Sequence, residues 1–275
     1  MDFSKLIEEI KSGVVHFLFL NPRGEKVGSG SGFLVKGKVV TCDHVIAQPY
    51  PEDTTVHIRF EDSSKEDTSS DTIFTLQEIR KRIESSSPED KNDYCVLHVP
   101  EIKYADRYNF GIEDAGRAEV GTEILLMGYP FDHLNLVSHR GYISSIFIKN
   151  GIEVLQLDAS VNASNSGGPL VHPYSKRVLG IITRKETSLS RNFDQLIDAL
   201  DQNARAFANP TGGNVLMGGI SIREAFLVIQ RQLRVVAVNM KRSSNAGIGF
   251  AFGLSPLKHN LPIDPSASAN TPKVG

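Results

Sequence analysis

Cysteine is scarce in this chain, and so is any excess of one charge. The 275 residues include two cysteines, Cys42 and Cys95, and carry a net charge of −2. Two cysteines are too few for the disulfide framework of many secreted domains, which favours a reducing compartment, so we expect a cytoplasmic protein. A net charge near zero gives no electrostatic basis for binding nucleic acid or an anionic membrane, and we expect neither partner.

Long hydrophobic runs are also missing. The strongly apolar stretch near the start, residues 14–20, is seven residues long, whereas a membrane-spanning helix needs about 20. No basic segment leads into it, so we expect neither a secretory signal nor a membrane span.

Metal and nucleotide motifs are absent as well. The histidines show no His-x-x-x-His or Cys/His ligand spacing, and we expect no metal ion or other cofactor. Residues 28–32, Gly-Ser-Gly-Ser-Gly, lack the Gly-Lys-Ser/Thr ending of a phosphate-binding loop. We therefore interpret them as the glycine-rich start of a strand.

What the chain does contain is a series of short β-rich runs separated by turn residues. They lie at 13–20, 31–36, 38–41, 55–60, 93–99, 122–128, 137–148, 152–158, 168–171 and 177–183. Alongside these runs, helical spacing occurs at Phe3–Ile10 and in a segment near 76–83, and the polar stretches 61–71 and 84–92 are typical of solvated loops. Many short strands with few helices between them predict β-barrels or a sandwich.

Three polar positions stand in an informative order. His44 follows the apolar run Val39–Val40, Asp93 opens the run Asp-Tyr-Cys-Val-Leu, and Ser166 lies in Asn-Ser-Gly-Gly-Pro-Leu. Among the known solutions to the serine triad, the order His, Asp, Ser belongs to the chymotrypsin arrangement.

The residues around these positions resemble the trypsin-like protease superfamily, and within it the HtrA/Deg branch. The resemblance rests on Gly30-Ser31-Gly32-Phe33-Leu34-Val35, Thr41-x-x-His44-Val45, Asp93-x-x-Val96-Leu97 and Asn165-Ser166-Gly167-Gly168-Pro169-Leu170. It implies an all-β fold of two six-stranded antiparallel barrels and a serine endopeptidase acting on proteins or peptides through an acyl-enzyme. Such enzymes are often regulated and often assemble as homo-oligomers.

The resemblance also implies roles for individual residues. Ser166 is the expected nucleophile, His44 the general base, and Asp93 the acid that orients the imidazole, with Asp90 as the alternative if the strand register is shifted. The expected oxyanion hole consists of backbone amides in the segment Ser164, Asn165 and Ser166.

Ser164 departs from the family pattern, which has glycine at this position. A side chain there can oppose the backbone conformation that points the amide at the oxyanion. Three interpretations stay open: a tolerated substitution, an oxyanion hole that assembles on activation, and a catalytically silent pseudoprotease.

Four residues are expected to border the pocket for the residue that precedes the cleaved bond. By resemblance, Ser160 lies at the pocket base, and strands carrying Ile182, Thr183 and Gly249 form its walls. No acid is present among them, so we expect a preference for small to medium aliphatic residues over Arg or Lys.

The segment between the last two strands is longer than the family needs. We expect one protease domain over residues 1–260, with a helical insertion at about 184–243 and a flexible tail or linker at 261–275. Within the insertion, helical spacing covers 192–208, Ser221-Ile-Arg-Glu224 is a capping box, and Val235–Met240 has the composition of a strand. The tail allows for a tethered partner domain.

Two further alternatives stay open. The first is a catalytically silent protease fold that binds peptides in the same cleft. The second concerns the thiols: Cys42 and Cys95 lie two residues from His44 and Asp93, respectively. Buried free thiols or a redox switch would both fit that spacing.

Overall fold

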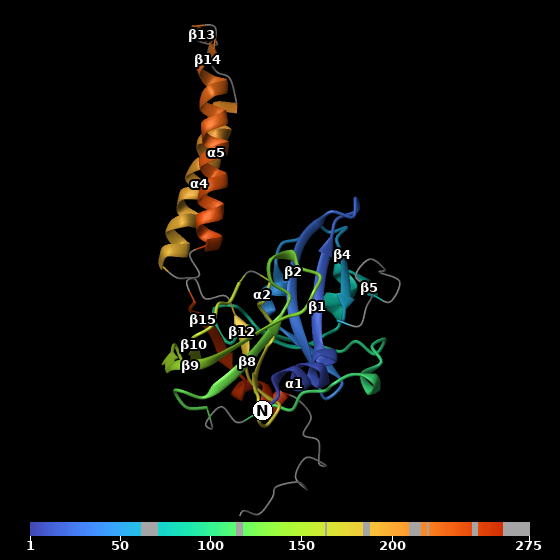
Figure 1. The fold of residues 1–275 in the computed structure, drawn as a ribbon. Coiled ribbons are helices and arrows are strands. Elements are labelled where there is room, and N and C mark those ends of the chain that lie inside the picture. Colours follow the sequence, from blue (N-terminus) through green and yellow to red (C-terminus); the bar gives the residue numbers. More distant parts are fainter. Residues whose placement is uncertain are drawn as a thin grey trace, which may run out of the picture. The chain divides into compact units, whose positions relative to one another are not determined.

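The computed structural model divides the chain into two compact units, a β-rich unit of residues 1–184 and 247–275 and a helical unit of residues 185–246. It describes residues 1–61, 71–113, 118–162, 164–183, 188–208, 216–218, 220–243 and 247–260 (Figure 1). The expected tail at 261–275 lies outside the described residues.

The first half of the β-rich unit is a curled seven-stranded antiparallel sheet. Its strand order is β5-β4-β1-β2-β3-β7-β6. The strands are β1 (Val14–Leu20), β2 (Lys26–Val35), β3 (Lys38–Thr41), β4 (Thr55–Arg59), β5 (Thr72–Thr75), β6 (Ile83–Ser87) and β7 (Tyr94–Leu97).

This sheet corrects the prediction of a closed six-stranded barrel. The strands β5 and β6 form its two edges, and within the described part of the chain no pairing closes the sheet. Both are short, and β6 has the sequence Ile-Glu-Ser-Ser-Ser, which led us to expect a loop at 84–92. An edge strand is held mainly by backbone hydrogen bonds to its one neighbouring strand, and it can form with few apolar side chains. Amino-acid composition therefore does not reveal it.

The second half is a closed six-stranded barrel, as the family resemblance implied. Its order is β10-β15-β12-β11-β8-β9. The strands are β8 (Glu123–Gly128), β9 (Val137–Lys149), β10 (Ile152–Leu157), β11 (Pro169–His172), β12 (Arg177–Thr183) and β15 (Gly249–Gly253). Its interior includes fully buried Leu155, Leu157, Ile182 and Ala251.

Short helices cover the β-rich unit. The α-helices are α1 (Phe3–Ile10), α2 (Asp43–Ala47), α3 (Leu76–Lys81) and α6 (Ser255–Asn260), and the 3₁₀ turns are η1 (Lys11–Gly13), η3 (Tyr104–Asp106) and η5 (Pro130–Asp132). The predicted N-terminal helix is confirmed, and its buried Leu6 and Ile10 join the core of the first sheet.

A glycine of β2 allows α2 to pack closely. A Cβ at Gly30 would lie 2.5 Å from a methyl group of Val45 in α2, closer than non-bonded carbons approach. The glycine-rich segment of β2 therefore seats the short helix that carries His44.

The helical unit is built on two antiparallel helices, α4 (Ser188–Ala208) and α5 (Ile222–Ser243). Between them lie two short strands, β13 (Leu216–Met217) and β14 (Ile220–Ser221). The expected helix over 192–208 is confirmed, and Ser221 caps α5 by accepting a hydrogen bond from the Glu224 amide at 3.2 Å.

The strand expected at Val235–Met240 is wrong, because these residues belong to α5. Their β-branched valines favour a strand locally, but the helix that starts at the Ser221 cap continues through them, with Ala237 buried. Among the described residues, no helix is both long and apolar enough to cross a membrane.

Candidate active site

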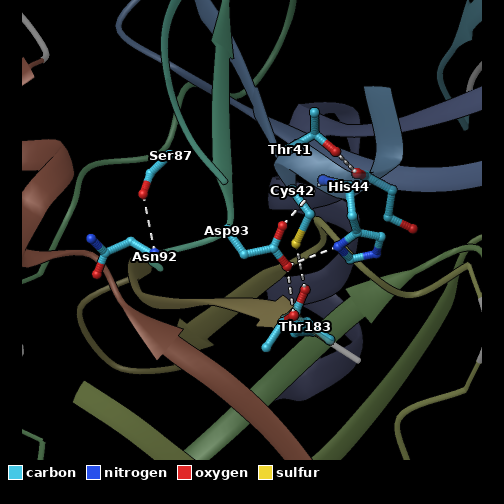
Figure 2. Close-up of polar contacts among 9 residues, drawn as sticks. Thr41, Cys42, His44, Ser87, Asn92, Asp93 and Thr183 are labelled. Carbon is cyan, nitrogen blue, oxygen red and sulfur yellow. Dashed lines mark hydrogen bonds and ion pairs between the residues drawn. The ribbon is translucent and has the colours of Figure 1, made fainter. Parts of the chain in front are cut away.

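His44 and Asp93 are joined by two hydrogen bonds (Figure 2). The Nδ1 atom of His44 lies 2.8 Å from Oδ2 of Asp93, and the backbone N–H of His44 donates to Oδ1 at 3.2 Å. The ring and the main chain of His44 are thus fixed by one carboxylate. Asp90, the alternative acid, is exposed on the preceding turn.

Asp93 is presented by a tight turn before β7. The Asp93 amide donates to the Pro88 carbonyl at 3.2 Å, and the Asn92 amide donates to Ser87 Oγ at 3.1 Å (Figure 2). The backbone of Asp93 has φ 44°, in the left-handed region that aspartate tolerates better than most residues. This turn directs the carboxylate toward α2.

Asp93 is fully buried, so its charge needs partners. Burial alone raises the pKa of a carboxyl group, but the hydrogen bond and charge of His44 and the hydroxyl of Thr183 oppose it, and the pKa of Asp93 lies below its ordinary value. The Thr183 hydroxyl donates to Asp93 Oδ2 at 2.8 Å (Figure 2). Asp93 is therefore held as a carboxylate.

The end of β12 connects the three segments that carry the predicted triad. The Ile182 carbonyl accepts from the Gly167 amide at 2.8 Å and from Cys42 Sγ at 3.3 Å. Gly167 follows Ser166, and Cys42 precedes His44 by two residues. Because the next residue, Thr183, binds Asp93, one dipeptide contacts the serine turn, the histidine helix and the aspartate.

Ser166 lies on a turn pinned against β2. Its carbonyl accepts a hydrogen bond from the Ser31 amide at 2.9 Å, and the residue is 4% exposed. The following Gly167 has φ +89°, and a Cβ there would lie 2.1 Å from the Ser31 carbonyl oxygen. Glycine is required at this position both by conformation and by the close approach of β2.

Ser164 adopts the left-handed conformation that a glycine would adopt most easily, with φ +72°. Its Oγ lies 2.6 Å from Ser29 Oγ, and its carbonyl accepts from Ser31 Oγ at 2.7 Å. Ser31 Oγ in turn accepts from the Tyr129 amide at 2.9 Å. These contacts of Ser29 and Ser31 were not predicted from the sequence, although both residues lie in the glycine-rich segment 28–32.

The three amides of the expected oxyanion segment are not equivalent. The Asn165 amide donates to the Asn162 carbonyl at 3.1 Å and is occupied. The amides of Ser164 and Ser166 thus remain the candidate donors to an oxyanion, as the family pattern implies.

The four predicted pocket residues fall into two groups. A Cβ at Gly249 would lie 2.5 Å from Val161 Cγ2, so β15 runs close beside the segment that contains the half-buried Ser160. By contrast, Ile182 is buried in the barrel core, and the hydroxyl of Thr183 binds Asp93. The pocket roles of all four stay predictions, but Thr183 has an additional contact that the sequence did not suggest.

Cys42 and Cys95 are buried free thiols. Burial raises the pKa of Cys42 well above its ordinary value and that of Cys95 to about 12. One ligand atom each from Cys42, His44 and Asp93 lies within 4.8 Å of the others. Because Cys42 is held as a protonated thiol that donates to Ile182, this cluster suits an acid–base pair better than a metal ion.

A family model described as "Trypsin-like peptidase domain" matches residues 30–181, more than half of the chain. The chain belongs to this family. The matched region contains His44, Asp93 and Ser166, and the trypsin-like fold agrees with the closed barrel and the curled sheet.

Curated relatives of this trypsin-like domain are HtrA/Deg proteases, as the motifs indicated. A "Probable periplasmic serine endoprotease DegP-like" of Rickettsia prowazekii (strain Madrid E) is 27% identical over 172 residues, covering 59% of this chain and 29% of the relative. "Serine protease HTRA3" of Homo sapiens is 27% identical over 202 residues, covering 66% and 40%. The chain thus spans less than half the length of these relatives.

A solved structure has the same fold at lower sequence identity. This structure, named "HtrA-type protease AlgWS227A with tripeptide", matches with a TM-score of 0.57 and 18% identity. The match covers 94% of this chain and 62% of that one. At this identity the likeness establishes the fold alone.

Proposed function

We propose that this chain is a serine endopeptidase with Ser166 as nucleophile, His44 as general base and Asp93 as orienting acid. The observation that carries the proposal is the pair of hydrogen bonds from His44 to the buried Asp93 carboxylate, at 2.8 and 3.2 Å. Because Asp93 accepts a hydrogen bond from the proton-bearing Nδ1 of His44, Nε2 is the basic nitrogen of the neutral imidazole. Ser166 is the proposed nucleophile because it lies in the matched region and in the motif Asn-Ser-Gly-Gly-Pro-Leu, which resembles that of the family.

In the proposed mechanism, Nε2 of His44 removes the proton of the Ser166 hydroxyl as Oγ attacks the scissile carbonyl carbon. The imidazolium that forms is stabilised by the Asp93 carboxylate, which keeps its negative charge because its pKa is low. His44 then gives the proton to the leaving amine, and an acyl-enzyme on Ser166 remains. Water, activated by the same imidazole, hydrolyses it.

The backbone amides of Ser164 and Ser166 are the proposed donors to the oxyanion. Because Ser164 holds φ +72° in this structure, its side chain does not prevent the conformation expected there of glycine. This supports a tolerated substitution among the three interpretations of Ser164. Each amide donor of this kind contributes about 10²–10³ in rate.

The proposed substrates are proteins or peptides with a small to medium aliphatic residue before the cleaved bond. Ser160 is neutral and lies between Ala159 and Val161, which both contribute to the apolar core of the barrel. A peptide-library profile dominated by Arg or Lys would contradict this specificity.

A cytoplasmic location stays our proposal, on the basis of the two free thiols.

The test is labelling of the purified chain with a fluorophosphonate probe, followed by mass spectrometry of the modified peptide. We expect an adduct on Ser166 that disappears in Ser166→Ala and falls strongly in His44→Ala. The matched control is Ser144→Ala, which removes an exposed hydroxyl from β9 and should leave labelling unchanged.

Labelling that persists in Ser166→Ala would refute the assignment of the nucleophile. A wild-type chain that is not labelled, and that binds peptides as tightly as the Ser166→Ala variant does, would favour the catalytically silent peptide-binding alternative.

A further inference from the structure

The helix α5 carries an apolar stripe beside its contact with α4. The stripe consists of Ile222, Phe226, Ile229, Leu233, Val236 and Met240, spaced four, three, four, three and four residues apart. At about 100° per residue, these six positions fall within an arc of roughly 80°. This spacing is the heptad pattern of a helix that pairs with another helix. We call these six residues the α5 seam.

Most of this seam is not covered by α4. Five of its six side chains are about half exposed: Ile222 47%, Ile229 51%, Leu233 48%, Val236 52% and Met240 54%. The residues of α5 that are buried in the helical unit, Gln230 and Ala237, lie on the adjacent face.

The apolar surface continues onto α4. The rings of Phe226 and Phe207 are 4.1 Å apart, and Phe207 and Leu196 of α4 are themselves 45% and 46% exposed. A unit of two helices has no third layer to bury such a face. Contiguous exposed apolar patches mark interaction sites.

The charges of α5 are segregated from the seam. Arg223, Glu224, Arg231 and Arg234 lie roughly 100–200° around the helix from it, and Arg234 is paired with Asp201 of α4 at 2.8 Å. On the side of the seam opposite to the buried Gln230 and Ala237, the neighbouring positions are the uncharged Ala225, Gln232 and Asn239. An uncharged border needs no oppositely charged partner and imposes no like-charge repulsion on self-association.

The geometry of the seam favours a second copy of the same helix. The seam spans about 27 Å, from residue 222 to 240, at 1.5 Å per residue. Apart from α4 and α5 itself, the described helices of this chain have at most eight residues, so none matches that length. The spacing is also palindromic: antiparallel pairing sets Ile229 opposite Leu233 and Phe226 opposite Val236.

We propose that two copies of this chain associate through the α5 seam, so that two helical units form a four-helix arrangement. The occupant of the seam is the α5 helix of the second copy. Such a contact is self-complementary, as a twofold dimer requires. It is independent of the proposed peptidase activity, because no triad residue takes part.

The test is sedimentation equilibrium of the full chain and of two neighbouring valine variants. Val236 lies on the seam and Val235 lies off it, although both are about half exposed, at 52% and 58%. We expect a wild-type mass near twice the chain's 30.2 kDa. Val236→Glu should weaken association by about 100-fold or more, because the dimer buries two unpaired carboxylates, while Val235→Glu should change it less than about threefold.

Helix content by circular dichroism checks that each variant folds, and Val236→Ser provides a milder change at the same position. A wild-type chain that stays monomeric at about 100 µM, a trimeric mass, or equal behaviour of the two glutamate variants would each overturn the proposal.

Discussion

The acid–base half of the candidate site, His44 with Asp93 and Thr183, differs from the oxyanion half, the turn at 164–168, in what holds it. In the acid–base half a fully buried carboxylate accepts three hydrogen bonds, two from His44 and one from Thr183. In the oxyanion half, neutral hydroxyls and carbonyls hold a backbone with positive φ at Ser164 and Gly167.

The two halves also differ in how completely their polar groups are satisfied. Asn165 is 1% exposed, and neither the oxygen nor the nitrogen of its side-chain amide has a hydrogen-bond partner among the described residues. An unsatisfied buried group typically costs about 1–3 kcal/mol. The difference teaches that the acid–base half depends on one charge, whereas the oxyanion half spreads its stability over several weak contacts.

The largest effect is expected from Asp93→Asn. The amide has no charge to stabilise the imidazolium and favours the wrong tautomer of His44, so kcat should fall about 10⁴-fold. Peptide-hydrolysis kinetics measure this, and Asp90→Asn, on the exposed neighbouring turn, is the matched control with an expected change below about twofold. Similar losses in both variants would show that the acid was assigned wrongly.

A smaller effect is expected from Thr183→Val, which deletes one donor to Asp93 and should lower kcat by about tenfold. Because the pKa of Asp93 is lowered on folding, this group stabilises the protein above the unfolded pKa of about 4, and the stability is lost as pH falls through the folded pKa. The valine variant should show a weaker rise in unfolding free energy with pH below about 4.

Urea unfolding between about pH 2.5 and 5 measures that slope. Thr183→Ser keeps the hydroxyl and should restore both the slope and the rate. Equal slopes in wild type and Thr183→Val would mean that the hydroxyl does not act on Asp93.

The smallest effect is expected from Ser29→Ala in the oxyanion half. Ser29 Oγ holds Ser164 Oγ at 2.6 Å, and losing one neutral hydrogen bond should lower kcat only a few-fold. Ser164→Gly removes both the hydroxyl and the strain, so it should preserve or raise activity. In that background Ser29→Ala should have no further effect, a coupling that a double-mutant cycle measures. If Ser29→Ala lowered kcat equally in the wild type and in the Ser164→Gly variant, Ser29 would not act through Ser164, and the oxyanion half would not depend on this hydrogen bond.

The family resemblance anticipated the closed barrel, and apolar periodicity anticipated the N-terminal helix and the helix over 192–208. Sequence patterns failed for β6, whose polar residues are held by its ladder with β7. They also failed for Val235–Met240, where β-branched residues favour a strand but lie in the second half of a helix capped at Ser221. The strand propensity of these valines is weak, and the helix that continues through them determines their conformation.

By itself, the sequence determined the family, through the motifs around His44, Asp93 and Ser166, because those residue types in that order leave few alternatives. Only the tertiary structure decided how the three segments are joined. Thr183 reaches Asp93 across 90 residues, and Ser29 reaches Ser164 across 135. Such contacts depend on which strands the fold brings together, and no local pattern in the chain encodes the partners of a hydroxyl group.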